Sequence, residues 1–419
     1  MDKFIVHKSE LSGAVIISGA KNAALPVMAA TILTDEKCII RNVPDLMDIR
    51  TMIKILECLG KEINFENNIL TITTISNKSF VAPYKLVRTM RASFCCLGPL
   101  LAKRKKAKVA LPGGCVIGAR PVDLHIKGLK ALGAEINIDK GYCQAKTNGL
   151  EGAHIYLGGS FGSSVLATAN VMMAAVLSKD ETVIEHAACE PEIKCLGLFL
   201  KKMGADIIGE GTSLLKIKGV KKLKGCEFEV IPDRIETGTF MAASIATRSP
   251  LKIVGANPMD LISVIEVVRN MGVSVDIDKD QSIFINPKGK LKPANITTLA
   301  YPGFPTDLQA QFMACLSLVE GVSLIAEKVY PDRFMHVAEL NRMGASIQKS
   351  GSYAIIEGKN MIYGAEIMAS DLRASAALVI AGLAAEGKTE ILRVYHIDRG
   401  YEKIENKLKK LGAKIKRQK

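Results

Sequence analysis

Six segments of the chain repeat one pattern of apolar and polar residues. Each has the end of an amphipathic helix, then a glycine, then a short run that alternates between apolar and polar positions. The segments are LECLGKEI at 56–63, LKALGAEI at 129–136, LKKMGADI at 200–207, VRNMGVSV at 268–275, LNRMGASI at 340–347 and LKKLGAKI at 408–415. We therefore predict six units of helix, glycine and strand, with each glycine in the left-handed conformation that ends a helix.

A second helix in each repeat is expected to be buried. Its sequence is apolar on nearly all sides and rich in small residues, which is typical of a helix enclosed by protein. These helices begin near residues 21, 91, 164, 236, 307 and 371, and each opens with a polar or charged residue. Unpaired N–H groups and the positive end of the helix dipole lie at that point, so the helix starts form an anion site if they converge.

The repeats divide the chain into two halves. The six glycines recur about every seventy residues, which is too long for a solenoid repeat and fits a βαβ-type unit. Three units precede a hinge near 231–236 and three follow it. This arrangement predicts two similar α/β domains, and a cleft between domains is a common place for a ligand.

Composition indicates a soluble globular protein. Of 419 residues, 48% are apolar and 23% charged. The charged N-terminal segment has no apolar run typical of an export signal, and the longest uncharged stretch, 152–178, contains Gly, Ser, Thr and Asn throughout. The ten cysteines show no metal-ligand spacing, so we expect free thiols in a reducing cytoplasm, with no metal and no other cofactor.

The formal net charge of +14 raises the alternative of a nucleic-acid-binding protein. The densest basic run, KRKKAK at 103–108, has no aromatic residues between its cations, which fits a solvated surface. We therefore expect neither nucleic acid nor a membrane as a partner. Single Lys and Arg residues beside glycines or helix starts instead indicate binding of small anions. Nothing in the pattern sets an oligomeric state.

Eight longer motifs resemble one enzyme family. They are SGAKNAALP at 18–26, MRASF at 90–94, LPGGCVIGARPVDLH at 111–125, IPDRIETGTF at 231–240, GFPTDLQAQF at 303–312, DRFMH at 332–336, DLRASAAL at 371–378 and HIDRGYE at 396–402. With these motifs the chain resembles the UDP-N-acetylglucosamine 1-carboxyvinyltransferase family over essentially its whole length. The resemblance implies an α/β fold, a two-domain inverted α/β barrel with six βαβ-type repeats, three in each domain.

The resemblance also implies domain boundaries and a reaction. One domain spans 21–231 and carries the Cys115 loop, the other joins 1–20 to 232–419, and the active site lies in the cleft between them. The implied reaction moves the enolpyruvyl group of phosphoenolpyruvate to the 3′-hydroxyl of UDP-N-acetylglucosamine and releases phosphate. This is the first committed step of peptidoglycan synthesis, and its implied partners are these two small-molecule substrates.

Cys115 lies in a glycine-rich loop that we expect to be mobile. Gly113, Gly114 and Gly118 leave little apolar packing around its thiol. A cysteine in an intracellular protein is more often a small buried residue, and the other nine keep that interpretation. The resemblance implies that this loop is a lid, and that Cys115 gives a proton to C3 of phosphoenolpyruvate and also forms a covalent adduct with it.

Phosphoenolpyruvate needs several cations in fixed positions. The resemblance implies that it is bound by Lys21, Asn22, Arg120, Arg333, Arg373 and Arg399, and that Lys21 and Arg399 are also catalytic. A lone Lys or Arg usually covers solvated surface. From sequence alone, Lys21 and Arg373 stand at starts of buried helices, whereas Arg399 qualifies only as a loop residue beside a glycine.

The attacking 3′-hydroxyl must lose a proton, which requires a carboxylate within hydrogen-bond reach. The resemblance implies that Asp307 is this base, although any Asp at this place could also be a cap or first-turn acid of the following helix. The residues implied for UDP-N-acetylglucosamine are Asn22, Arg91, Arg120, Pro121, Val122, Asp123, Leu124, His125, Ser164, Val165, Asp307 and the backbone near Val329.

Two departures and one rival enzyme qualify the resemblance. Leu166 stands where the family usually has a glycine in SVGAT, which weakens the assignments of Ser164 and Val165, and Cys195 stands where it often has an aspartate. Within the same fold, 5-enolpyruvylshikimate-3-phosphate synthase is the alternative. That enzyme has no cysteine-bearing PGGC lid, which favours the nucleotide-sugar transferase.

Overall fold

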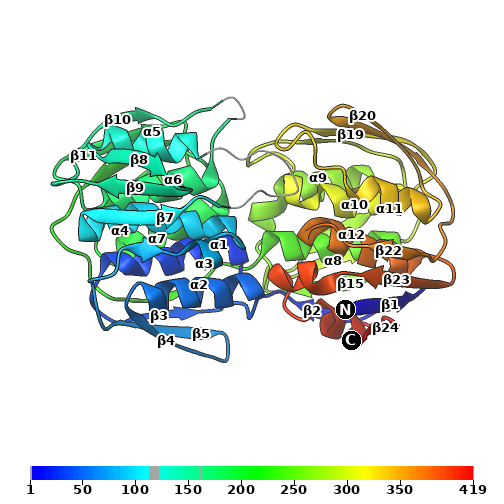
Figure 1. Ribbon diagram of the computed structural model, residues 1–419. Helices are drawn as coiled ribbons and strands as arrows, with labels where there is room; N and C mark the ends of the chain where they lie inside the picture. The colour runs from blue at the N-terminus through cyan, green and yellow to red at the C-terminus, as the bar shows by residue number, and fades with distance from the viewer. Residues whose placement is uncertain (1, 113–121, 160–161, 419) are drawn as a thin grey trace. The chain divides into compact units, whose positions relative to one another are not determined.

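The computed structural model describes residues 2–112, 122–159 and 162–418. Within these residues the chain forms two compact units (Figure 1). One unit is built from 19–231, and the other joins 2–18 to 232–418. Each unit contains three four-stranded sheets, so the predicted three repeats per domain and the α/β fold class are confirmed.

The unit of residues 19–231 contains the first three sheets. Their strand orders are β14-β3-β5-β4, β6-β7-β9-β8 and β10-β11-β13-β12. The bounds are β3 (Cys38–Arg41), β4 (Lys61–Glu66), β5 (Ile69–Thr74), β6 (Val81–Ala82), β7 (Lys106–Ala110), β8 (Glu135–Asp139), β9 (Tyr142–Lys146), β10 (His154–Tyr156), β11 (Glu181–Glu185), β12 (Asp206–Ile208), β13 (Leu214–Lys218) and β14 (Glu227–Glu229). In each sheet the first pair is parallel and the other two pairs are antiparallel.

The other unit repeats the same plan. Its sheets are ordered β2-β15-β17-β16, β18-β19-β21-β20 and β22-β23-β1-β24, again with one parallel pair followed by two antiparallel pairs. The bounds are β1 (Lys3–His7), β2 (Ala14–Ile16), β15 (Leu251–Val254), β16 (Ser274–Ile277), β17 (Ile283–Asn286), β18 (Asn295–Thr298), β19 (Gly321–Glu327), β20 (Ser346–Ser350), β21 (Tyr353–Gly358), β22 (Glu366–Met368), β23 (Lys388–Leu392) and β24 (Ile415–Gln418). The N-terminal strands β1 and β2 therefore complete two sheets of the C-terminal unit.

Three buried helices fill the interior of each unit. They are α1 (Lys21–Ala30), α4 (Leu97–Arg104) and α6 (Val165–Ala175) in one, and α8 (Arg234–Ala246), α10 (Gln309–Leu316) and α12 (Leu372–Ala384) in the other. Every residue of α1 except Asn22 is buried. The helices α8, α10 and α12 contact one another. The apolar sequence of these helices thus predicted their burial, because an isolated helix of that composition could not face water.

Amphipathic helices form the second set in each repeat. They are α2 (Met47–Cys58), α5 (Asp123–Ala131), α7 (Pro191–Lys202), α9 (Ile262–Asn270), α11 (His336–Arg342) and α13 (Ile404–Lys410), with the short α3 (Tyr84–Val87) beside them. The glycine after each of the six has a positive φ, as predicted. The angles are 86° at Gly60, 86° at Gly133, 102° at Gly204, 86° at Gly272, 93° at Gly344 and 98° at Gly412. Side chains other than glycine strain that conformation.

The described residues include neither a membrane-spanning helix nor a cluster of metal ligands. None of their helices is both long and apolar enough to span a lipid bilayer. Nor do the described His, Cys, Asp and Glu side chains form a group of three or more that could bind a metal ion.

Candidate active site

Asp307 lies in the short 3-10 helix η4 (Thr306–Leu308), directly before the buried helix α10. Its carboxylate oxygens each accept a hydrogen bond from a different arginine. Nη1 of Arg333 lies 2.8 Å from Oδ1, and Nη2 of Arg373 lies 3.0 Å from Oδ2. These described contacts are charge-assisted pairs rather than the backbone cap expected of an ordinary first-turn acid. Asp307 is also an acidic residue in the first turn of η4, so the interpretation as a first-turn acid and the interpretation as a base are compatible.

The two arginines are buried, whereas Asp307 is partly exposed to solvent. The Arg333 and Arg373 side chains are 7% and 3% exposed, whereas that of Asp307 is 26% exposed. Burial alone would lower the pKa of each guanidinium. On balance the pKa of Arg333 is raised by the Asp307 carboxylate, and that of Arg373 by Tyr401 and then Asp307. Both arginines therefore stay charged and fix a carboxylate that solvent or a ligand can reach.

Glu327 is a functional candidate that the sequence analysis missed. It ends β19, has 0% exposure, and its carboxylate accepts hydrogen bonds from side chains and backbone of neighbouring segments. One donor is the Thr306 hydroxyl beside Asp307, at 2.9 Å, and another is the backbone N–H of Val329, also at 2.9 Å. The signal available in the sequence was an acidic residue at a strand position where alternation predicts an apolar one.

Arg399 ends the 3-10 helix η5 (Val394–Arg399), which contacts α12. Its neighbour Asp398 pairs with Arg417 instead, through two hydrogen bonds. A Cβ at Gly400 would lie 2.6 Å from Cδ1 of Leu372, so this glycine lets the turn approach α12 closely. The turn therefore holds Arg399 next to the helix that carries Arg373.

Tyr401 is buried in the same region and contacts three neighbouring side chains. Its hydroxyl lies 2.8 Å from Oγ1 of Thr239 and 3.1 Å from Nε2 of Gln311, and its ring centroid lies 5.3 Å from the Arg373 guanidinium carbon. This cation–π contact and the buried hydroxyl network help to hold Arg373 in place. Side chains from α8, α10 and α12 thus share one polar cluster with Tyr401.

In the unit of residues 19–231, Lys21 is the first residue of α1 and is buried. Its Nζ lies 3.3 Å from Oδ2 of Asp48 in the first turn of α2. The two side chains are 9% and 6% exposed, so this is a buried ion pair. Asn22 follows Lys21 on the side of α1 that is partly exposed. Asp48 was not foreseen, because its pairing depends on a contact between two helices.

His125 is buried in α5 beside the start of a 3-10 helix, η2 (Arg91–Cys96). Burial, followed by the nearby Arg91 guanidinium, lowers the pKa of His125 to about 3. Nδ2 of Asn170 lies 2.8 Å from Nδ1 of the ring, and the Phe94 ring meets it edge-on at 5.0 Å. His125 is therefore a neutral, rigidly oriented imidazole.

Ser164 caps α6 with a side-chain hydrogen bond from the N–H of Ala167 at 3.3 Å. Val165 is the first residue of the helix, and Leu166 packs partly buried against the core. The leucine that replaces the family's glycine thus leaves the cap intact. Val122 precedes α5, Asp123 is its exposed first residue, and Leu124 is partly buried.

Three of the expected residues, Cys115, Arg120 and Pro121, lie outside the described residues. The nine other cysteines are free thiols. The expectation that all nine are buried is wrong for Cys58, which is exposed, and Cys189 and Cys226 are partly exposed. Cys195 is buried in the core at 1% exposure, where an aspartate would need polar partners.

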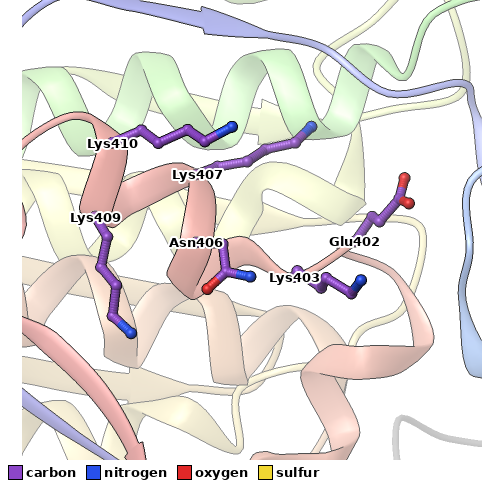
Figure 2. A pocket seen from close by; sticks show the side chains of 6 residues that line it. All are labelled: Glu402, Lys403, Asn406, Lys407, Lys409 and Lys410. Atoms are coloured by element: carbon purple, nitrogen blue, oxygen red, sulfur yellow. The ribbon is translucent and has the colours of Figure 1, made fainter.

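A surface hollow on α13 contains none of the expected residues. It is lined by Glu402, Lys403, Asn406, Lys407, Lys409 and Lys410 (Figure 2). Lys407 donates to Oε1 of Glu236 at 2.7 Å and to Oγ of Ser18 at 2.7 Å, so its charge is already compensated within the protein. Lys409 and Lys410 are exposed. We therefore assign the hollow to solvated surface.

Comparisons with known proteins agree over the full length of the chain. A UDP-N-acetylglucosamine 1-carboxyvinyltransferase of Methylacidiphilum infernorum is 52% identical over 418 residues, covering 100% of this chain and 99% of that protein. The UDP-N-acetylglucosamine 1-carboxyvinyltransferase 2 of Carboxydothermus hydrogenoformans is 51% identical over 419 residues, with coverage of 100% and 99%. The chain belongs to the UDP-N-acetylglucosamine 1-carboxyvinyltransferase family. A broader family model, described as EPSP synthase (3-phosphoshikimate 1-carboxyvinyltransferase), matches residues 5–408 of this family member.

Solved structures show the same fold at lower sequence identity. The enolpyruvyl transferase NikO from Streptomyces tendae is 23% identical, with a TM-score of 0.90 and coverage of 99% of this chain and 98% of that one. An EPSP synthase from Acinetobacter baumannii is 18% identical, with a TM-score of 0.77 and full coverage of both chains, 100% each. These likenesses confirm the predicted enolpyruvyl transferase-like fold of this member of the UDP-N-acetylglucosamine 1-carboxyvinyltransferase family.

Proposed function

We propose that the protein transfers the enolpyruvyl group of phosphoenolpyruvate to the 3′-hydroxyl of UDP-N-acetylglucosamine and releases phosphate. The observation that carries the proposal is the 52% identity, over the whole chain, to a relative named for carboxyvinyl transfer to UDP-N-acetylglucosamine. The product would be committed to peptidoglycan synthesis. A cytoplasmic location completes the proposal, and the free thiols of the described cysteines support it.

In the proposed reaction Asp307 is the base. The 3′-oxygen attacks C2 of phosphoenolpyruvate, and its proton passes to the Asp307 carboxylate. Support comes from the pair of arginines that hold this carboxylate in one orientation while leaving it 26% exposed. Two cations stabilise the ionised form, which is the form that can accept a proton.

Cys115 is the proposed proton donor to C3 of phosphoenolpyruvate. The addition of a nucleophile at C2 and a proton at C3 gives a saturated intermediate. Loss of phosphate from C2 and of one proton from C3 then restores the double bond, so atoms and charge balance. The covalent adduct with Cys115 is a second proposed state, in which the sulfur occupies C2 in place of the sugar oxygen.

Cations on both units are the proposed partners of the phosphate and carboxylate of phosphoenolpyruvate. They are Lys21, Arg120, Arg333, Arg373 and Arg399, with Asn22 beside them. The burial of Lys21, Arg333 and Arg373 supports the proposal, because a buried cation interacts with an anion more strongly than a solvated one does. These groups stabilise negative charge without needing to reorganise.

The nucleotide sugar is proposed to contact residues at several helix starts. They are Arg91, Arg120, Pro121, Val122, Asp123, Leu124, His125, Ser164, Val165 and Val329, together with Asn22 and Asp307. The neutral His125 can serve as a hydrogen-bond donor but not as a cation. The N–H of Val329 is bonded to Glu327, so a ligand contact from that residue's backbone must use its carbonyl.

Phosphate release from phosphoenolpyruvate tests the function. We expect release only when UDP-N-acetylglucosamine is present, with the enolpyruvyl ether identified by mass spectrometry. Shikimate-3-phosphate is the matched alternative acceptor, because the broader family model is described by that activity. Equal turnover with shikimate-3-phosphate would overturn the proposal in favour of the rival transferase.

A further inference from the structure

We propose that Glu327 is a positioning residue that orients both the base Asp307 and the Val329 backbone, through one buried carboxylate. The inference rests on the proposed function, because it assigns Asp307 to proton removal and Val329 to nucleotide-sugar binding. It adds a residue that touches neither reacting atoms nor substrate and acts only through its hydrogen-bond partners.

The Glu327 carboxylate is fully enclosed and accepts four described hydrogen bonds. Oε1 accepts from the Thr298 hydroxyl at 2.6 Å and from the backbone N–H groups of Val329 and Tyr330, each at 2.9 Å. Oε2 accepts from the Thr306 hydroxyl at 2.9 Å. An ionised carboxylate only accepts hydrogen bonds and has about four lone-pair sites, so this set of donors matches it.

Thr306 relays the effect of Glu327 to the base. Because its hydroxyl donates to Glu327, an oxygen lone pair remains to accept from Nη1 of Arg333, at 3.1 Å. The same Nη1 lies 2.8 Å from Oδ1 of Asp307. Glu327 thus sets the direction of the Thr306 hydroxyl, which in turn helps to hold the guanidinium that orients the base.

The other oxygen of Glu327 fixes the turn after β19. It binds the N–H groups of Val329 and Tyr330, while the N–H of Lys328 donates to Oγ1 of Thr298 at 3.0 Å. Tyr330 also contacts the relay, since the Arg333 guanidinium carbon lies 5.9 Å from its ring centroid. Both the base and the proposed ligand backbone therefore depend on the same side chain.

An apolar side chain would serve packing better at this place. Burying a carboxylate is unfavourable unless hydrogen bonds compensate, and the two residues before Glu327 in β19, Ile325 and Ala326, are buried and apolar. The contribution of Glu327 must then come from the hydrogen bonds themselves. Three of the four bonds end on the segments that carry Asp307 and Val329, and the fourth ends on Thr298 of β18.

Glu327→Gln in the full chain is the first test. The amide keeps the shape but presents an N–H₂ group to one set of donors, so either the Thr306 hydroxyl or the Val329 turn must reorient. We expect kcat to fall at least tenfold and KM for UDP-N-acetylglucosamine to rise several-fold. KM for phosphoenolpyruvate should rise as well, because the relay holds Arg333, a proposed contact of that substrate. Glu357→Gln, an exposed acid on β21 of the same sheet, is the matched control and should match the parent.

Thr306→Val separates the two effects. It removes the relay hydroxyl but leaves the Val329 turn bonded to Glu327, so kcat should fall with little change in KM for the nucleotide sugar. The losses in kcat from Glu327→Gln and Thr306→Val should also be non-additive in the double variant, because both interrupt one chain of hydrogen bonds. This cycle keeps the proposal testable even where Glu327→Gln lowers stability.

The outcomes are distinguishable from a failure of the proposed function. A parent protein that does not release phosphate with the nucleotide sugar overturns the function and this role with it. An active parent, combined with Glu327→Gln that lowers only the thermal midpoint and leaves kcat and both KM values unchanged, overturns the positioning role alone. Fully additive losses in the double variant would likewise reject the relay through Thr306.

Discussion

The side-chain amide of Asn170 donates a hydrogen bond to Nδ1 of His125 across 2.8 Å. The same amide nitrogen donates to the Phe94 carbonyl at 2.9 Å, and the amide oxygen accepts the N–H of Gly98 at 2.7 Å. Nδ1 must then be the acceptor nitrogen of the ring, so the proton of neutral His125 is on Nε2. A ring held this way can donate to a ligand but is costly to protonate.

Stability should accordingly depend on the ionisation of His125. Its pKa falls from 6.5 to about 3 in the folded protein, so between these values the unfolded chain binds more protons. The free energy of unfolding should therefore decrease as pH falls through this window, by about 1.4 kcal/mol per pH unit for one such group. In urea unfolding, His125→Gln should flatten this slope, while the exposed control His154→Gln should not. Identical slopes in all three proteins would contradict the buried neutral state.

Asp307→Asn should lower kcat by two orders of magnitude or more. The amide is close in size and keeps one oxygen for an arginine, but it cannot take up a proton. Asp332→Asn is the matched control, because Asp332 is an exposed acid next to Arg333. Steady-state phosphate release measures both variants, and an Asp307→Asn rate within about threefold of the parent would assign this residue to structure alone.

Lys21→Met should reduce kcat/KM for phosphoenolpyruvate by at least a hundredfold, because an apolar side chain leaves no cation at the start of α1. Loss of one partner of a buried ion pair should also destabilise the unit by about 3 kcal/mol. Lys54→Met, at an exposed position of α2, is the control for a general change of charge. Circular dichroism and kinetics separate the two effects. A normal kcat/KM in a less stable Lys21→Met would remove Lys21 from the substrate site.

A small phosphonate epoxide should label Cys115 and spare the nine other cysteines. Burial raises the pKa of Cys38, Cys95, Cys96, Cys143 and Cys315, so these thiols form little of the reactive thiolate. Cys58 is exposed and is the internal control. A neutral alkylating reagent should react with it, whereas an anionic epoxide should not be concentrated there. Peptide mapping by mass spectrometry decides, and epoxide label on Cys58 at the rate of Cys115 would contradict the assignment.

The helix-ending glycines provide a test of the repeat. Gly204 has φ of +102° with no neighbour within 4 Å of an added Cβ, so Gly204→Ala should destabilise by about 1–2 kcal/mol through backbone strain alone. Gly149→Ala is the matched change without positive φ, and the nearest atom there is Cε of Lys179 at 3.5 Å. It should be neutral or slightly stabilising. Thermal unfolding that shows equal losses in both variants would argue against a left-handed requirement.

The repeat and the buried helices could be predicted from the sequence because both depend on local patterns. A glycine such as Gly204 follows its helix directly, and the burial of a helix such as α6 is evident from its own composition. Lys21 and Arg373 were likewise found at helix starts. Their roles in substrate binding remain predictions from resemblance.

The partners of those residues could not be predicted, because they come from distant parts of the chain. Asp48 meets Lys21 only when two helices pack, and Asn170 meets His125 across 45 residues of sequence. Glu327 was also missed, because its proposed role depends on hydrogen bonds to segments that only the folded structure brings next to it. The exposure of Cys58 depends on which side of α2 faces the core, and a composition argument about cysteines ignores that.

The strand β1 lies between β23 and β24, and Lys3 pairs with Gln418 in antiparallel register. The first and last strands of the chain are therefore immediate neighbours (Figure 1). A short linker from the end of β24 to the start of β1 would allow a circular permutant, with new ends opened at the tight turn of Asn67 and Asn68 between β4 and β5. All six sheets would keep their strands in such a protein, so the order in which the repeats are synthesised could be changed without altering the fold.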